Sequence, residues 1–271
     1  MSIKFSVILP IYWKNEFNEF KKTFLSIINQ TLKPNEIVII FDGKVNSNIE
    51  CFIKKQKKKY NIKLLKNQKN LGLGKTLKKA VNYCKNEIIA RVDCDDINLP
   101  DRFKRQISMM IKNNLDLVGS STLEIDLNNR IKMIKSNPLK DFEIKKKLKF
   151  RNPINHQSVI FKKKAVLISG NYENFPFFED YYLWVKMARN NHKFGNLKKI
   201  LVKVRVDKDF YKRRSGKSYF LNYCKFLRRC LKIKFITSVD FIILLILRGL
   251  IYLLNVTLIK NIYIFFLRER I

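Results

Sequence analysis

The N-terminal part of the chain alternates continuous apolar runs with segments of helical spacing, and this alternation limits the folds open to it. The apolar runs span residues 5–9, 36–41, 62–65 and 87–92. They are apolar nearly throughout, so the strands that they predict must be covered on both faces. Helical segments separate them, for example at 16–29 and 77–84. The pattern predicts an α/β fold with a mostly parallel sheet flanked by helices.

Polar residues follow three of these strands. They lie at Pro10–Tyr12, at Asp42–Gly43 and at Asp93–Asp96. Ligands of open α/β sheets bind beyond the carboxyl ends of the strands, so these three loops are expected to form a ligand site.

The middle of the chain has a less regular pattern. It predicts a basic helix at 141–150, a strand at 158–161 and an amphipathic helix at 181–191. The composition changes near Arg205, where a basic segment and then an apolar stretch begin. We therefore place a domain boundary after residue 206.

The chain is strongly basic. Its 56 Lys and Arg residues against 22 Asp and Glu give a formal net charge of +34. Nucleic acid, anionic lipid or a phosphorylated substrate would suit this charge, although abundant Lys, Asn and Ile also indicate compositional drift. Five cysteines without paired spacing and two histidines make a zinc site improbable. With no secretory leader pattern at the start, we expect reduced thiols and a cytoplasmic chain.

An acidic cluster follows the fourth apolar run. Asp93, Asp95 and Asp96 lie within four residues. Carboxylates this close repel one another unless a cation neutralises them, and their oxygens suit Mg²⁺ or Mn²⁺. The alternative for Asp96, and for Asp101 further on, is a helix cap.

Five segments together resemble one enzyme family. In chain order they are 5–12 with Glu16, 70–74, 90–102, 152–159 and 178–184. They are similar to motifs of the family 2 glycosyltransferases with the A-type fold, especially the amylovoran-type subgroup of exopolysaccharide and lipopolysaccharide biosynthesis. The resemblance implies a catalytic domain at 1–206, with a nucleotide-sugar-binding half at 1–100 and an acceptor half at 101–206.

The resemblance also implies roles for individual residues. Asp93 and Asp95 would hold the divalent cation, Mn²⁺ or Mg²⁺, and the nucleotide-sugar would contact Pro10, Tyr12, Glu16, Asp42, Asn70, Gly72 and Asp93. Core packing for Tyr12, a helix cap for Glu16 and an ordinary turn at Gly72 and Gly74 are the alternatives. The family often has two acids where this chain has Phe41 and Asp42. This difference weakens any inference about which nucleotide base the donor carries.

The catalytic and acceptor roles fall in the later motifs. Asp180 would accept the proton of the acceptor hydroxyl in an inverting transfer, with Glu179 beside it. Acids at a helix N-terminus are the alternative for this pair. His156 and Trp184 would contact the acceptor, or serve as a structural histidine and a packing residue.

The tail, residues 207–271, is basic and amphipathic. Asp240 and Arg248 interrupt its apolar stretch, and Thr237, Arg248 and Asn255 share one stripe of a helix. A central arginine is costly in a bilayer, so we expect the tail to lie on an anionic membrane surface. A helical hairpin packed on the domain or in a dimer, and a true membrane span, are the alternatives.

These features predict a metal-dependent inverting glycosyltransferase, peripheral on the inner face of the cell membrane. It would transfer a sugar, from UDP-hexose or UDP-HexNAc, to a lipid-linked, lipopolysaccharide or polysaccharide acceptor. The competing hypotheses are a sugar nucleotidyltransferase, a basic nucleic-acid-binding protein and a non-catalytic accessory of polysaccharide assembly. No nucleic-acid partner is expected, and the oligomeric state stays open.

Overall fold

The computed structural model describes residues 3–126, 128, 130–206, 216–254 and 258. In these residues nine strands form one sheet in the order β3-β2-β1-β4-β8-β6-β9-β5, with β7 paired to β6. The strands are β1 (Phe5–Ile11), β2 (Glu36–Asp42), β3 (Ile62–Asn67), β4 (Ile88–Arg91), β5 (Ile97–Asn98), β6 (Leu117–Ile125), β7 (Ile131–Lys135), β8 (Ile160–Lys162) and β9 (Phe194–Arg205).

The first four strands pair in parallel, as the sequence pattern predicts. β8 then runs antiparallel to both β4 and β6, so the sheet as a whole is mixed. β6 and β9 are the longest strands, and their mutual pairing is parallel. The sequence pattern did not predict either of them.

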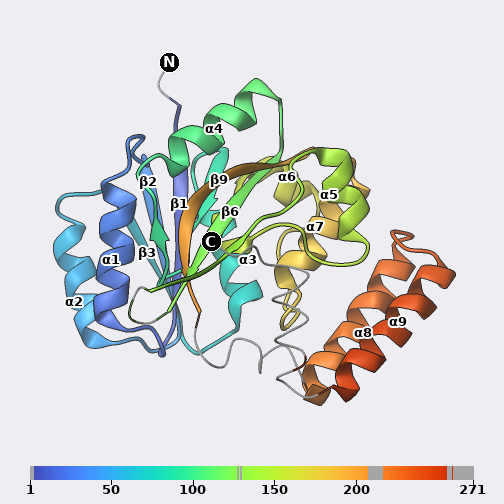
Figure 1. Cartoon of the computed structure of the whole chain (residues 1–271). Coiled ribbons are helices and arrows are strands. Elements are labelled where there is room, and N and C mark those ends of the chain that lie inside the picture. Colours follow the sequence, from blue (N-terminus) through green and yellow to red (C-terminus); the bar gives the residue numbers. More distant parts are fainter. Residues whose placement is uncertain (1–2, 127, 129, 207–215, 255–257, 259–271) are drawn as a thin grey trace.

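Helices cover both faces of the sheet (Figure 1). The described helices are α1 (Phe17–Ile28), α2 (Ser47–Gln56), α3 (Leu73–Tyr83), α4 (Arg102–Lys112), α5 (Asp141–Leu148), α6 (Lys163–Ile168), α7 (Glu179–Arg189), α8 (Gly216–Lys232) and α9 (Ser238–Leu253), with a short 3₁₀ turn at His156–Ser158. One apolar core lies between the sheet and α1, α2 and α4, and the other between the sheet and α3, α5, α6 and α7.

The strand β1 shows how the sequence builds these two cores. Its side chains alternate between the faces: Phe5, Val7 and Leu9 enter the core under α1 and α4, whereas Ile8 enters the core under α3 and α7. All seven residues of β1 are buried. This two-sided burial is the reason why the run is apolar throughout.

The helices α8 and α9 form a hairpin beside α7 (Figure 1). Phe226 of α8 stacks on Phe178 with ring centroids 5.2 Å apart, and Leu227 and Cys230 are buried in the same core as α7. The described part of the predicted tail therefore shares the core of the preceding domain. Residues 207–215, 255–257 and 259–271 of that tail, Asn255 among them, lie outside the described residues.

The polar residues of α9 have specific positions. Thr237 and Asp240 form a capping box at its start, in which Asp240 N donates to Thr237 Oγ1 and Thr237 N donates to Asp240 Oδ2. Asp240 thus satisfies the first turn of the helix. Within the described parts of the chain, no helix has both the length and the apolar content that a membrane crossing needs.

Candidate active site

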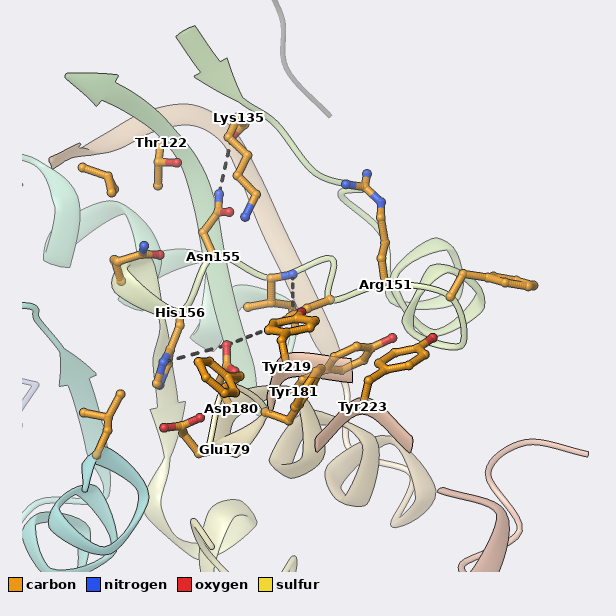
Figure 2. Close-up of a pocket in the computed structure, with 18 of the residues that line it drawn as sticks. Thr122, Lys135, Arg151, Asn155, His156, Glu179, Asp180, Tyr181, Tyr219 and Tyr223 are labelled. Atoms are coloured by element: carbon orange, nitrogen blue, oxygen red, sulfur yellow. Dashed lines mark hydrogen bonds and ion pairs between the residues drawn. The ribbon is translucent and has the colours of Figure 1, made fainter. Parts of the chain in front are cut away.

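A cavity of about 650 Å³ opens at the ends of β4 and β6 (Figure 2). Its walls come from several parts of the chain. They are the end of β4, the start of α3, the strands β6, β7 and β9, the loop at 150–157, the N-terminus of α7 and the α8–α9 hairpin. Arg91, Asp93, His156, Glu179 and Asp180 all line it. The cavity therefore brings together predicted metal, catalytic and acceptor residues from three separate motifs.

Asp180 lies in the first turn of α7 and its side chain is 16% exposed. Asn152 Nδ2 donates a hydrogen bond of 2.8 Å to Asp180 Oδ2. Burial raises the pKa of the Asp180 carboxyl, while the Tyr181 amide, Arg91 and Asn152 oppose that rise. An aspartate with a raised pKa that lines a cavity suits a general base.

Glu179 lies beside Asp180 in the same turn. Burial, and to a smaller extent the charge of Asp180, raises the pKa of Glu179 to about 7, although a backbone hydrogen bond opposes the rise. Free backbone amides at a helix N-terminus stabilise carboxylates, so the helix-terminus interpretation fits this position and is compatible with the predicted catalytic one.

His156 lies between Asp180 and Tyr172. Its Nδ1 is 3.8 Å from Asp180 Oδ2, and its Nε2 is 3.0 Å from the Tyr172 hydroxyl. Burial lowers the pKa of His156 well below its usual value, so the ring is neutral at neutral pH. The neutral ring adds no charge to the site, and it also lines the cavity.

Trp184 lies beneath His156, with ring centroids 5.9 Å apart and planes at 78°. It is fully buried and does not line the cavity. The prediction that Trp184 contacts an acceptor does not fit this position, because a side chain without exposed surface has no face to offer a sugar. Its position is that of the packing residue, under the histidine.

The acidic cluster divides into three environments. Asp93 lines the cavity and is ion-paired with Arg91. Burial and the neighbouring charge of Asp93 raise the pKa of Asp95 to about 6. Asp96 is buried, and its Oδ1 accepts a hydrogen bond of 3.0 Å from Arg205 N, which gives it a structural role at β9.

The donor chemistry of Asp93 and Asp95 fits a divalent cation. Two hard oxygen ligands that repel each other gain from a shared cation, and Mg²⁺ or Mn²⁺ takes its other ligands from phosphates and water. Among the described residues, no group of three or more His, Cys, Asp and Glu side chains is arranged to hold a metal ion. A cation held by Asp93 and Asp95 therefore stays a prediction.

Arg91 is the main site residue that the sequence analysis missed. Its side chain is 3% exposed, and its Nε and Nη1 atoms have no hydrogen-bond partner among the described residues. The charge of Arg91 acts on Asp95 and also on Glu179 and Asp180, so it lies between the two acidic groups. A charged residue ending a run as apolar as Ile88–Ala90 is the signal that could have found it.

Of the residues predicted to bind the nucleotide-sugar, Asp93 lines this cavity and the others lie outside it. Pro10 is buried in β1, whereas Tyr12 is 40% exposed at the end of that strand, which argues against core packing. Glu16 occupies the N-cap position of α1 and is exposed, and its side chain makes no cap hydrogen bond. Contact with a nucleotide stays a prediction for all of them.

Asp42 organises the turn at Asn70–Gly74. Its carboxylate accepts hydrogen bonds from Leu71 N at 2.8 Å, Gly72 N at 3.0 Å and Asn67 Nδ2 at 3.0 Å. Gly72 has a φ of 85°, which favours glycine. The structure therefore gives Asp42 and Gly72 a role in holding this turn, next to Leu73 of the cavity wall.

The model of the family described as Glycosyl transferase family 2 matches residues 6–168. The chain belongs to this family. The match covers the parallel half of the sheet and the acidic cluster. Together with the relatives below, it shows that the chain is a glycosyltransferase.

Two relatives cover most of the chain. The amylovoran biosynthesis glycosyltransferase AmsE of Erwinia amylovora is 32% identical over 231 residues, which are 85% of this chain and 86% of that protein. The UDP-Gal:alpha-D-GlcNAc-diphosphoundecaprenol beta-1,3-galactosyltransferase of Escherichia coli is 36% identical over 253 residues, 93% of this chain and 92% of that protein. The similarity to exopolysaccharide enzymes that the motifs predict is confirmed.

A solved structure supports the fold. The mannosyltransferase PcManGT of Pyrobaculum calidifontis, in complex with GDP-Man and Mn²⁺, has a TM-score of 0.63 and is 14% identical, covering 86% of this chain and 65% of that one. This chain thus has the A-type fold that its own motifs predict.

Proposed function

We propose that the chain is a divalent-cation-dependent, inverting glycosyltransferase that uses a UDP-sugar and a lipid-linked acceptor. The observation that carries the proposal is the placement of Asp93 and Asp180 in the walls of one cavity. The names of the two relatives support an acceptor in polysaccharide assembly, and one of them acts on a diphosphoundecaprenol-linked sugar.

The transfer itself follows from this placement. The acceptor hydroxyl gives its proton to the Asp180 carboxylate, while its oxygen forms a bond to the anomeric carbon. The bond between that carbon and the β-phosphate oxygen breaks, and the nucleoside diphosphate leaves. A divalent cation held by Asp93 and Asp95 would stabilise the charge that grows on this diphosphate. Asn152 holds the Asp180 carboxylate in place through its hydrogen bond.

The α8–α9 hairpin supports a location at a membrane surface. Val239, Ile242, Ile243, Ile246 and Leu250 of α9 are each at least 47% exposed. A helix that packs through one face and exposes a second apolar face suits the bilayer interface, and the basic surface suits anionic lipid. The proposed location is the inner face of the cell membrane.

The test is a panel of nucleotide sugars with Mn²⁺ and the full-length protein in mild detergent. The readouts are nucleoside diphosphate release and, in the same samples, donor binding. Turnover of one donor is expected, with loss in Asp95→Ala and in Asp180→Asn. Asp101→Asn is the control, since Asp101 is a half-exposed acid of α4 outside the cavity.

Each outcome separates two hypotheses. Asp180→Asn should keep donor binding and lose turnover, whereas Asp95→Ala should weaken both. Donor binding by the wild type without turnover, with acceptor lipids present, would favour a non-catalytic accessory. Neither binding nor turnover of any donor would contradict the proposal.

A further inference from the structure

The α8–α9 hairpin forms one wall of the catalytic cavity. Tyr219 and Tyr223 of α8 line it, and so do four residues of α9: Leu244, Leu247, Arg248 and Ile251. These four positions lie on one face of a helix, because they are spaced by three, one and three residues. The hairpin is therefore part of the binding site as well as a surface of the molecule.

Acidic and basic side chains both line the cavity. Asp93, Glu179 and Asp180 are acidic, whereas Arg151 and Arg248 are basic, and all five line the cavity. Figure 2 shows His156 and Glu179 on one side of the opening, with Arg151 and Tyr223 on the other. An anionic ligand group is attracted to the arginine side and repelled by the carboxylates.

Arg248 lies against two aromatic rings of α8. The Arg248 guanidinium lies 4.5 Å from the ring centroid of Tyr219 and 5.6 Å from that of Tyr223. Arg151 lines the same cavity. Stacking on a ring fixes the plane of a guanidinium, which favours the two-pronged hydrogen bonding that arginine makes with phosphates.

An apolar path leads from this arginine side to the outside. Leu247 lines the cavity and is 51% exposed, and Phe150 and Phe177 of the rim are 56% and 43% exposed. On the next face of α9, Ile243, Ile246 and Leu250 are exposed as well. A ligand with its anionic group at the arginines can thus lay an apolar chain along α9.

We infer that Arg151 and Arg248 bind the diphosphate of a glycosyl-diphosphoryl-lipid acceptor. The lipid chain then leaves over Leu247 and α9, and the sugar hydroxyl points to Asp180. This inference rests on the proposed function and adds to it an anion subsite that lies apart from the donor diphosphate.

The experiment uses octyl diphosphate, which carries the diphosphate and an apolar chain but no sugar. Its binding to the full-length protein is measured by calorimetry, with octyl monophosphate and octanol beside it. Each titration is run without nucleotide and with saturating UDP and Mn²⁺. The variants are Arg151→Gln and Arg248→Gln, and the control is Arg228→Gln, an exposed arginine of α8 outside the cavity.

Octyl diphosphate should bind at least fivefold tighter than octyl monophosphate, and octanol should not bind measurably. Each cavity variant should lose about tenfold in octyl diphosphate affinity, as expected for one charge-assisted phosphate contact. Arg228→Gln should stay within twofold of the wild type. Arg248→Lys, which keeps the charge, should lose less than Arg248→Gln and thereby separate charge from hairpin packing.

Three results would overturn the inference. They are unchanged binding in both cavity variants, an equal loss in Arg228→Gln, and competition between octyl diphosphate and UDP for one site. UDP binding is followed in all variants and should stay within twofold of the wild type. Failure of UDP binding in the wild type would count against the proposed donor, while the octyl diphosphate series without nucleotide would still decide the subsite.

Discussion

Asn152 Nδ2 donates a hydrogen bond of 2.8 Å to Asp180 Oδ2, across 28 residues of sequence. The bond stabilises the ionised carboxylate, whereas burial of Asp180 stabilises the protonated one. The pKa of the proposed base is therefore set by burial against several opposing contributions, and one of these depends on the Asn152 side chain alone. This makes the pH dependence of the enzyme sensitive to residue 152.

Asn152→Ala should move the acid limb of the pH profile of kcat/KM upward. The direction follows because the variant removes a contribution that lowers the pKa of Asp180, so the base is protonated up to a higher pH. The measurement is the initial rate between pH 5 and pH 9. Asn48→Ala in α2, an exposed asparagine, should leave the profile in place. A uniform loss of rate without a shifted limb would argue against this role.

Glu179 should reduce the stability of the protein at high pH. Its pKa of about 7 in the folded state lies above the ordinary value of 4.5, so the folded state holds this proton more tightly than the unfolded state. The free energy of unfolding should therefore fall as the pH rises from about 4.5 to about 7. Glu179→Gln should then be more stable than the wild type by about 2 kcal/mol at pH 8, and nearly equal to it at pH 5.

Urea unfolding at the two pH values measures this difference. Glu50→Gln is the control, because the hydrogen bond and ion pair with Lys66 lower the pKa of Glu50. That variant should gain no stability at pH 8. An equal effect of Glu179→Gln at both pH values would contradict the assignment.

Arg91 and Asp93 should be energetically coupled. Loss of the Arg91 guanidinium leaves the Asp93 carboxylate beside two other aspartates with no positive partner. Breaking a buried ion pair costs several kcal/mol, and the cost is smaller here because Asp93 is part-exposed. In EDTA, Arg91→Met should lose about 2 kcal/mol of unfolding free energy, and Arg91→Met with Asp93→Asn should recover a part of it. Strictly additive losses in the double-mutant cycle would show that the two residues are independent.

Gly74 should be intolerant of a side chain for a packing reason. A Cβ added there would lie 1.9 Å from the Glu173 carbonyl oxygen, in the segment that leads into α7. Gly74→Ala should therefore cost about 2–3 kcal/mol, since backbone has to move. Gly249→Ala in α9 is the matched control: a Cβ there meets nothing within 4 Å, so that variant should be neutral or gain up to about 1 kcal/mol. Chemical denaturation of both variants compares them directly.

The parallel half of the fold could be predicted from the sequence because its strands are buried on both faces. The continuous apolar run inside Glu36–Asp42, for example, can be recognised without knowing which strands lie beside it. The strand β6 is buried as completely, yet it contains Gly119, Ser120, Ser121 and Thr122. Some of its polar groups bond to residues distant in sequence, for example when Asn155 Nδ2 donates to Ser120 O. A pattern search reads such a run as a loop.

The site shows the same limit. Asp93, Asp95, Glu179 and Asp180 stand out because acids are scarce in this chain and follow strand ends or begin a helix. The contacts of Arg91, Asn152 and the α8–α9 hairpin join segments far apart in sequence, and only packing brings them to one cavity. The sequence places Arg248 on the polar stripe of a predicted interfacial helix. In the structure Arg248 lines the cavity, whereas Ile246 and Leu250 are exposed.

The exposed face of α9 gives the last prediction. Ile242 and Ile246, one helical turn apart, are 55% and 58% exposed. With this face in the bilayer interface, an aspartate in place of one isoleucine removes the free energy gained by burying that side chain in the lipid. Ile246→Asp should therefore weaken binding to vesicles of anionic phospholipid by about tenfold or more. Ile111→Asp is the control, because Ile111 is 55% exposed on α4, far from the hairpin in Figure 1.

Co-sedimentation with vesicles at low and high salt measures the effect, and the basic surface predicts weaker wild-type binding at high salt. The alternative is that a second copy of the chain covers this face. Light scattering of the free protein tests this by measuring its oligomeric state. A wild-type dimer that Ile246→Asp converts to a monomer, with vesicle binding unchanged, would assign the face to self-association. If Ile246→Asp keeps the wild-type vesicle affinity, or if Ile111→Asp loses as much affinity, α9 is not the membrane contact. A specific interfacial face must respond to a charge placed within it, and a charge placed elsewhere must have no such effect.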